Sequence, residues 1–184
     1  MTRHVVFIHG AGEGAYKADK LLADNLQHEL GSTYKVDFLR MQDEENAPYD
    51  TWKDQVESTL AAIDSPVTLV GHSIGGSHLL KVLTEIKIST PISGVFILDA
   101  PFWGGVGWQY EGYKELELPN DTSVKLPEYI KLFLYHATDD EIVPFEHLNL
   151  YTELIPQAVP RTINTGGHQL DNDLSVVARD ILKM

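Results

Sequence analysis

The chain has 184 residues and a formal net charge of −13, from 27 acidic and 14 basic side chains. Such an acidic surface repels phosphate backbones and anionic lipids, which argues against nucleic acid and membranes as partners. Cysteine is absent, so disulfides, thiolate metal sites and a cysteine nucleophile are excluded. The length and the hydrophobic content of 43% are typical of one globular domain over residues 1–184.

The first residues, MTRHVVFIHG, lead directly into a strand-like run and lack the small-residue cleavage site of a signal peptide. No apolar run in the sequence reaches the length of a membrane span. We therefore expect a cytoplasmic protein. Because the sequence carries no dimerisation pattern, we also expect a monomer.

Short β-branched or aromatic runs alternate along the chain with segments that carry apolar residues at helical spacing. The runs predict strands over His4–His9, Tyr34–Leu39, Val67–Val70, Gly94–Leu98, Ile130–Tyr135 and Pro160–Asn164. The intervening segments predict helices over Ala15–Leu30, Tyr49–Ile63, Ile74–Glu85, Phe145–Leu154 and Asp171–Leu182. Since several strands are almost wholly apolar, we predict a three-layer α/β/α fold, with helices on both faces of a mostly parallel, doubly wound sheet of about six strands.

One stretch, residues 101–128, departs from this alternation. It is long for a connection and rich in glycine, tryptophan and tyrosine. Long connections in compact domains are usually functional or disordered, and clustered aromatic residues argue against disorder. We predict a short cap or pocket wall over the carboxyl edge of the sheet, where ligands bind in open α/β folds. The alternative is a surface loop that packs its own aromatic side chains.

A glycine-rich turn, Gly10–Ala15, follows the first strand. It fits the dinucleotide-binding pattern G-x-G-x-x-A, in which backbone N–H groups meet a pyrophosphate. Glu13 would repel phosphate and no acidic residue ends the second strand, although Arg40 there would suit a 2′-phosphate. The other interpretation is an oxyanion loop, with the Ala11 N–H facing the space above the sheet. His9 is then a hydrogen-bonded structural histidine.

A second glycine-rich turn, Gly71–Gly75 with the sequence GHSIG, joins the run VTLV to a helix-like segment. This is the G-x-S-x-G pattern of a nucleophile elbow, in its required strand–turn–helix context. Small residues two positions before and after Ser73 would relieve crowding in so tight a turn. The N–H groups of Ile74 and Ala11 would then share an oxyanion hole. Alone, the pattern also fits a serine that caps a helix.

A serine nucleophile needs a histidine base and a carboxylate that orients it, and in this architecture the order is serine, acid, histidine. His168 follows a double glycine just beyond the last strand and is the best candidate for the base. Asp139 and Asp140 follow the fifth strand, and Asp99 ends the fourth. The residue pattern alone does not decide which of these three aspartates is the acid. His72 is expected to point away from the pocket. The spacing of histidines and carboxylates suggests no metal site.

Four segments spread over nearly the whole chain, HGAG, GHSIGG, ATDDEIVP and GGHQLDNDL, resemble the α/β-hydrolase superfamily. The likeness is to its small members that begin at the family's third strand, and it is unspecific for substrate. The family's D-x-x-V-P pattern falls on Asp140 and favours it over Asp139. The resemblance implies that Ser73 is the nucleophile, His168 the base and Asp140 the acid. It also implies that Ala11 and Ile74 are the oxyanion donors.

The sequence departs from the fullest family pattern in two places. The opening antiparallel strands are missing, and residues 101–128 stand where larger members carry a helical cap domain. Both departures argue against large or long-chain substrates. Four aromatic residues of the segment are expected near the acyl or alcohol group, with Trp103 favoured: Phe102, Trp103, Trp108 and Tyr110.

These patterns predict a serine hydrolase that cleaves small carboxylic esters or related acyl compounds through an acyl-enzyme on Ser73, without a metal or organic cofactor. Two other classes stay open. One is a non-enzymatic binding protein on a hydrolase scaffold, which an exposed aromatic surface at residues 101–128 would favour. The other is a dinucleotide-binding oxidoreductase that uses the Gly10–Ala15 turn. The fold alone does not choose among them, because one scaffold hosts many functions.

Overall fold

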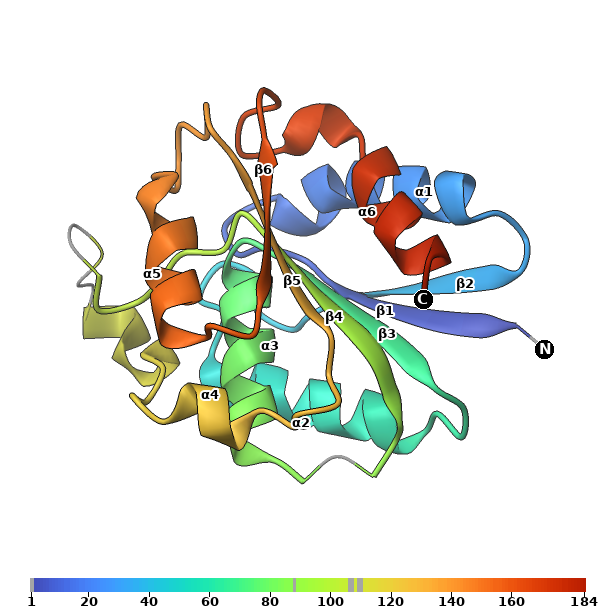
Figure 1. Cartoon of the computed structure of the whole chain (residues 1–184), viewed down its shortest axis with the longest axis horizontal. Coiled ribbons are helices and arrows are strands. Elements are labelled where there is room, and N and C mark those ends of the chain that lie inside the picture. Colours follow the sequence, from blue (N-terminus) through green and yellow to red (C-terminus); the bar gives the residue numbers. More distant parts are fainter. Residues whose placement is uncertain (1, 88, 106–107, 109–110) are drawn as a thin grey trace.

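Six strands form one sheet in the computed structural model, which describes residues 2–87, 89–105, 108 and 111–184. All neighbouring strands are parallel, in the order β2-β1-β3-β4-β5-β6 (Figure 1). Their bounds are Arg3–Ile8 (β1), Tyr34–Leu39 (β2), Val67–His72 (β3), Ile92–Leu98 (β4), Leu132–Ala137 (β5) and Val159–Ile163 (β6). The predicted six-stranded, doubly wound sheet is confirmed.

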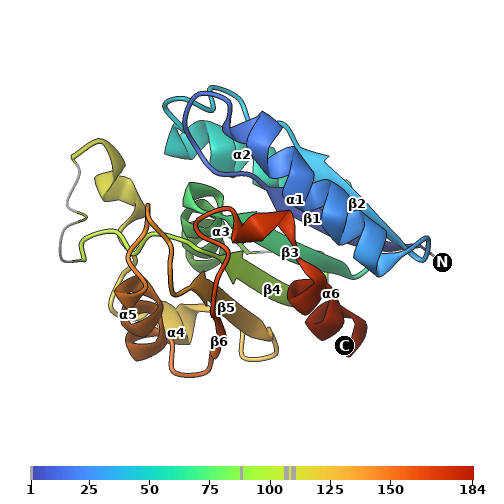
Figure 2. The ribbon, with the colours of Figure 1, turned by 90° about the horizontal axis from the view of Figure 1, so that it is seen from above.

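Helices cover both faces of this sheet (Figure 2). They are α1 (Ala15–Leu30), α2 (Tyr49–Ala61), α3 (Ile74–Glu85), α4 (Thr122–Lys125), α5 (Glu146–Leu154) and α6 (Ser175–Leu182), with 3₁₀ turns η1 (Glu111–Leu116) and η2 (Leu170–Asn172). Apolar side chains of α1 and α6 pack on one face, and those of α2, α3 and α5 pack on the other. Within the described ranges, no helix is long and apolar enough to span a membrane.

The interior strand β1 shows why the strand sequences are continuous apolar runs. Val5 and Phe7 belong to the core cluster beneath α1 and α6, whereas Val6 and Ile8 belong to the cluster on the opposite face. Successive side chains of a strand point to opposite faces, and all four of these residues are fully buried. A strand covered by helices on both faces therefore needs apolar residues at every position.

The end of the chain corrects one prediction. A single helix was expected over Asp171–Leu182, but the chain forms the turn η2 and then begins α6 at Ser175. Residues 170–172 have φ angles of 49°, 51° and 55°, in the left-handed region that cannot continue a right-handed helix. The Asp171 N–H donates to the Gly166 carbonyl at 2.8 Å, so the turn closes the loop that carries His168. The other predicted elements differ from the structure only at their ends.

The described part of residues 101–128 packs against the α3 side of the sheet and includes η1 and α4. Leu116 and Leu126 are buried in the core cluster of that face. Lys81 of α3 donates from Nζ to the Glu117 carbonyl at 2.9 Å. The segment is therefore anchored by apolar burial at several points along its length. Its role as a cap or pocket wall stays a prediction.

Gly75, in the first turn of α3, allows this helix to approach the end of β1. A Cβ at this position would collide with the carbonyl oxygens of His9 and Ile8, the second at 2.6 Å. We expect Gly75→Ala to lower the free energy of unfolding by about 1–3 kcal/mol, the usual range for overpacking. Urea denaturation measures this difference. Gly112→Ala is the matched control, because a Cβ there meets no atom of the described residues within 4 Å, and equal stability of the two variants would contradict the prediction.

Candidate active site

Ser73 is the single residue between β3 and α3, at the apex of the turn that joins them. Its backbone has φ 52° and ψ −130°, a left-handed conformation that is strained for a residue with a side chain. The turn is held by the Ser73 N–H, which donates to the Leu98 carbonyl at 2.8 Å. A Cβ on Gly71 would lie 2.7 Å from the Gly76 Cα, so the turn needs glycine before the serine. This is the backbone shape of a nucleophile elbow.

The structure brings Ser73, His168 and Asp140 into one chain of hydrogen bonds. His168 Nε2 lies 3.0 Å from Ser73 Oγ, and His168 Nδ1 lies 2.8 Å from Asp140 Oδ2. The other carboxylate oxygen, Asp140 Oδ1, accepts the N–H groups of Ile142 and Val143, each at 2.8 Å. The Asp140 carboxylate is fully buried, whereas 14% of the His168 side chain is exposed. The arrangement has the contacts of a Ser-His-Asp triad.

The charge of Asp140 sets the tautomer of His168. Burial alone would raise the pKa of Asp140, but hydrogen bonds from His136, His168 and the Val143 N–H outweigh it and hold that pKa well below its usual range. Asp140 is therefore an ionised acceptor at neutral pH, and His168 donates to it from Nδ1. The lone pair of Nε2 then faces the Ser73 hydroxyl, which is the orientation a general base needs.

Asp139, the first alternative acid, lies beside the glycine loop that precedes His168. Its carboxylate accepts the N–H groups of Gly166 at 3.3 Å and Gly167 at 2.9 Å. No hydrogen bond between Asp139 and the His168 ring is found in the described part of the chain. Asp139 thus shapes the loop that presents His168, and Asp140 is the neighbour that contacts the ring.

Asp99, the second alternative acid, is fully buried at the end of β4. One carboxylate oxygen accepts the Ala137 N–H at 2.8 Å, and the other has no hydrogen-bond partner among the described residues. Burial raises the pKa of Asp99 to about 7, although the nearby His136 and the Ala137 N–H act in the opposite direction. A carboxyl group in this state is a poor permanent anion at neutral pH, and it does not contact His168.

His136 was not a candidate on sequence grounds, yet it lies against the acid. Asp99, His136 and Asp140 place ligand atoms within 4.8 Å of one another, a grouping that could hold a metal ion. His136 Nε2 donates to the Val143 carbonyl at 2.9 Å, and Asp140 Oδ2 already accepts from His168. The ligand atoms of His136 and Asp140 are therefore engaged within the protein, and we assign no metal to the group. His136 and Asp140 are four residues apart, at the end of β5 and just after it, but Asp99 comes from the end of β4, and residue spacing does not reveal that it joins them.

The loop after β1 lies directly beside Ser73. A Cβ on Gly10 would be 3.1 Å from Ser73 Cβ and 3.6 Å from Ser73 Oγ. Ala11 follows in this loop, and Ile74 begins α3, where first-turn N–H groups lack partners within the helix. Within the described chain, neither the Ala11 N–H nor the Ile74 N–H donates to a protein acceptor. Both are therefore available to an oxyanion, and this role stays a prediction.

The same loop shows why the dinucleotide alternative loses support. Its N–H groups are directed at Glu44, from the connection between β2 and α2. The Glu44 carbonyl accepts from Gly12 at 2.7 Å, and its carboxylate accepts from Gly14 at 3.3 Å and Tyr16 at 2.8 Å. A carboxylate thus occupies the helix N-terminus that a pyrophosphate would need.

The predicted pocket residues form part of an aromatic group near α5. Trp103 is buried and meets Trp108 edge to face, with ring centroids 5.3 Å apart. The Trp108 ring lies 5.4 Å from that of His147, whose Nδ1 accepts the Phe102 N–H at 2.7 Å. Tyr110 lies outside the described residues. Contact of this group with a substrate stays a prediction.

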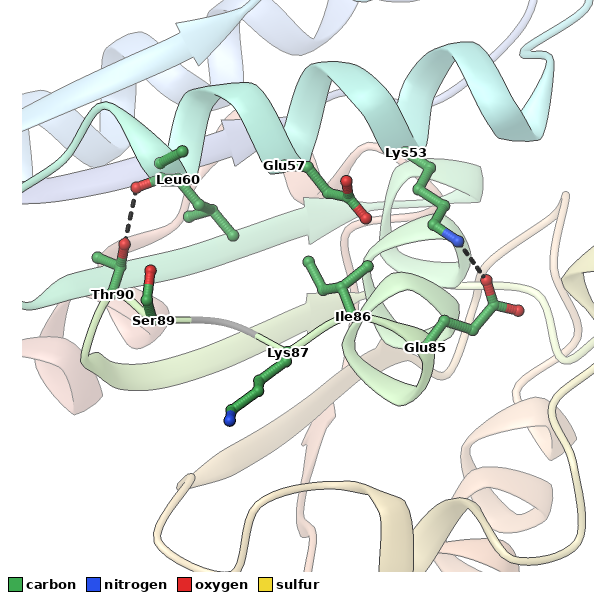
Figure 3. Close-up of a pocket in the computed structure, with 9 residues that line it drawn as sticks. Lys53, Glu57, Leu60, Glu85, Ile86, Lys87, Ser89 and Thr90 are labelled. Atoms are coloured by element: carbon green, nitrogen blue, oxygen red, sulfur yellow. Dashed lines mark hydrogen bonds and ion pairs between the residues drawn. The ribbon is translucent and has the colours of Figure 1, made fainter.

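A groove of about 370 Å³ runs between α2 and the segment after α3 (Figure 3). Lys53 and Glu85 form an ion pair across it at 2.8 Å, and Thr90 donates to the Leu60 carbonyl at 2.7 Å. Ser73, Asp140 and His168 do not line this groove. It is therefore not a candidate for the active site.

Comparison with known families agrees with this geometry. The model of the alpha/beta hydrolase family matches residues 5–142, which is most of the chain. The chain belongs to the alpha/beta hydrolase family. No curated protein sequence matches this hydrolase. The match includes the elbow and Asp140 and ends before the segment with His168, so the placement of His168 rests on the structure.

Solved structures similar to this hydrolase show the same fold at low identity. The ydeN gene product from B. subtilis has a TM-score of 0.70 and 19% identity, over 99% of this chain and 98% of that one. A serine hydrolase involved in carbazole degradation, the CarC enzyme, has a TM-score of 0.75 and 16% identity, over 98% and 90%. Est1E from Butyrivibrio proteoclasticus has a TM-score of 0.71 and 16% identity, over 99% and 86%. At such identities the likeness shows the fold alone.

Proposed function

We propose that this member of the alpha/beta hydrolase family is a serine hydrolase that cleaves small carboxylic esters or related acyl compounds. The observation that carries the proposal is the hydrogen-bonded chain from Asp140 through His168 to Ser73, which ends at a strained serine elbow. The strained backbone at Ser73 exposes the hydroxyl where a base can reach it. No cofactor is required for this chemistry.

In the proposed mechanism, Ser73 Oγ attacks the acyl carbon while His168 Nε2 takes the hydroxyl proton. The carbonyl oxygen becomes an oxyanion, which the N–H groups of Ala11 and Ile74 stabilise. Collapse of the intermediate breaks the bond to the alcohol, and His168 returns the proton to the leaving oxygen. Water, deprotonated by His168, then attacks the acyl-enzyme and releases the carboxylic acid and free Ser73. Asp140 orients His168 and stabilises its charged form throughout.

The substrate is proposed to be small, because residues 101–128 are short and no other segment among the described residues forms a cap domain. Trp103 is buried in the aromatic group near α5 and is not displayed on an exposed surface, which weakens the alternative of a binding protein. Among the similar structures, Est1E is named as bound to ferulic acid, and EaEST from Exiguobacterium antarcticum is named an esterase. These names support an acyl substrate and do not specify one.

Hydrolysis of p-nitrophenyl esters with increasing acyl length tests the proposed function. We expect kcat/KM to be at least about tenfold higher for the acetate than for the octanoate, because a short pocket wall offers little apolar surface to a long chain. Acid quenching during acetate turnover is expected to trap an acetyl group on the peptide that contains Ser73. Hydrolysis without any acylated Ser73 would contradict the acyl-enzyme mechanism.

A further inference from the structure

The residue before the nucleophile, His72, is buried and faces acceptors with both ring nitrogens. Nδ1 lies 2.8 Å from Asp19 Oδ2, and Nε2 lies 2.8 Å from the backbone carbonyl oxygen of His168. Only 2% of the His72 side chain and 3% of the Asp19 side chain are exposed. A carboxylate and a carbonyl both accept, so both nitrogens of His72 must carry protons. The geometry is that of a buried imidazolium paired with a carboxylate.

Asp19, on α1, receives further hydrogen bonds from the neighbouring loops. Its Oδ2 also accepts the Gly10 N–H at 2.7 Å, and its Oδ1 accepts Gln169 Nε2 at 2.8 Å. The pair therefore includes the residue before Ser73, and it contacts the residue before Ala11, His168 and the residue after His168. One ion pair thus joins the elements that present the oxyanion loop, the nucleophile and the base.

We propose that Asp19 and His72 are a positioning pair that holds the Gly10 loop, Ser73 and His168 in register for catalysis. This inference rests on the proposed function of Ser73 and His168. The pair affects the rate through the placement of the catalytic groups, because misplacement of a catalytic group by about 1 Å can lower a rate roughly a hundredfold. A contribution to folding stability does not explain the pair, because a buried ion pair often adds little to the free energy of unfolding beyond what apolar residues of the same size would add.

The charged state of the pair supports this role over a defined pH range. Burial would lower the pKa of His72, but the charge and hydrogen bond of Asp19, with the more distant Asp99, raise it to about 9. Burial would raise the pKa of Asp19, but the charge and hydrogen bonds of His72, with those of Gln169 and Gly10, lower it to about 2. Both groups are therefore charged at neutral pH.

Other titratable groups face His72 from the elements packed around it. The His168 ring lies with its centroid 4.9 Å from that of His72, His9 interacts electrostatically from the end of β1, and Asp99 does so from β4. Since the pKa of His72 is raised, its contribution is present at lower pH and is lost as pH rises through about 9. Deprotonation then leaves a ring nitrogen facing an acceptor without a proton, which releases the Asp19 or the His168 contact.

The test compares the rate at which a fluorophosphonate labels Ser73 in the wild type, Asp19→Asn and Asp24→Asn, across about pH 6 to 10. Asp24 lies on the same helix, is exposed and pairs with Lys20, so its variant is the matched control. We expect Asp19→Asn to label about 10- to 100-fold more slowly at neutral pH. We also expect its alkaline fall in rate to move to lower pH, because His72 loses the carboxylate that holds its proton. Asp24→Asn is expected to follow the wild type.

Three outcomes would overturn the inference. Asp19→Asn could label with the wild-type rate and pH profile, or it could lose rate uniformly at every pH with an unchanged profile, which is the result of a merely structural role. If this variant does not fold, ¹⁵N NMR of the wild-type histidine rings decides. An alkaline fall in labelling that coincides with the titration of His72 supports the pair, and a profile independent of that titration overturns it. A folded wild type that is not labelled at Ser73 would instead contradict the proposed function itself.

Discussion

The Ser73→Ala variant is expected to hydrolyse p-nitrophenyl acetate about 10⁴- to 10⁶-fold more slowly than the wild type in kcat, the range seen when a serine nucleophile is removed. The substitution deletes the only hydroxyl that His168 Nε2 contacts among the described residues. It leaves the backbone hydrogen bonds of the elbow in place, because these are made by the N–H and carbonyl groups of Ser73. Steady-state kinetics and a urea denaturation curve separate the loss of chemistry from any loss of stability.

Ser123→Ala is the control for this variant. Ser123 donates its hydroxyl to Gln157 on an exposed part of α4 and has no contact with the triad. Its substitution is expected to leave the rate of hydrolysis unchanged. If Ser73→Ala retained the rate of this control, the ester-cleaving chemistry would have to lie elsewhere in the molecule.

The Asp140→Asn variant is expected to lower kcat about 10⁴-fold at neutral pH, because it reverses the tautomer of the base. Asp140 Oδ1 accepts two backbone N–H groups, from Ile142 and Val143. In the variant, the amide oxygen keeps those two bonds, so the amide NH₂ group is directed at His168 Nδ1. His168 must then accept there and carry its proton on Nε2, which faces Ser73 and can no longer take the hydroxyl proton. Measurement of kcat against pH for the wild type and for Asp140→Asn tests the expected loss.

Asp139→Asn and Asp99→Asn distinguish Asp140 from its two alternatives. Asp139 binds backbone N–H groups of the loop before His168, and Asp99 is bonded to Ala137, so neither change alters the partner of the His168 ring. Both variants are expected to keep kcat within about tenfold of the wild type. A loss in either that equals the loss in Asp140→Asn would assign the acid to that residue instead.

The sequence predicts those features of the hydrolase that depend on short-range pattern. Each buried strand is visible as an apolar run, because helices on both faces require apolar residues at every position. The elbow is visible because its crowding demands glycine at fixed distances from Ser73. The break before α6 was not visible, since the left-handed backbone at residues 170–172 depends on a contact with Gly166 and not on the local apolar spacing.

Long-range polar contacts could not be predicted from residue spacing. Asp19 and His72 are 53 positions apart, and each alone looks like an ordinary residue of a helix or a strand end. The expectation that His72 points away from the pocket did not include the contact of its buried ring with the backbone of His168. The contact of Glu44 with the glycine-rich loop could not be predicted either, because Glu44 lies in a different connection of the chain. Such pairs follow from the strand order, which local patterns leave undetermined.

Intact-mass spectrometry after exposure to a fluorophosphonate, on the wild type and on Ser73→Ala, tests most directly whether Ser73 is an activated nucleophile. Such a reagent bonds only to a serine whose hydroxyl is deprotonated by a neighbouring base. We predict one adduct on the wild type and none on the variant. A folded wild type without an adduct, or an equal adduct on both proteins, would contradict the serine-hydrolase function proposed for this chain.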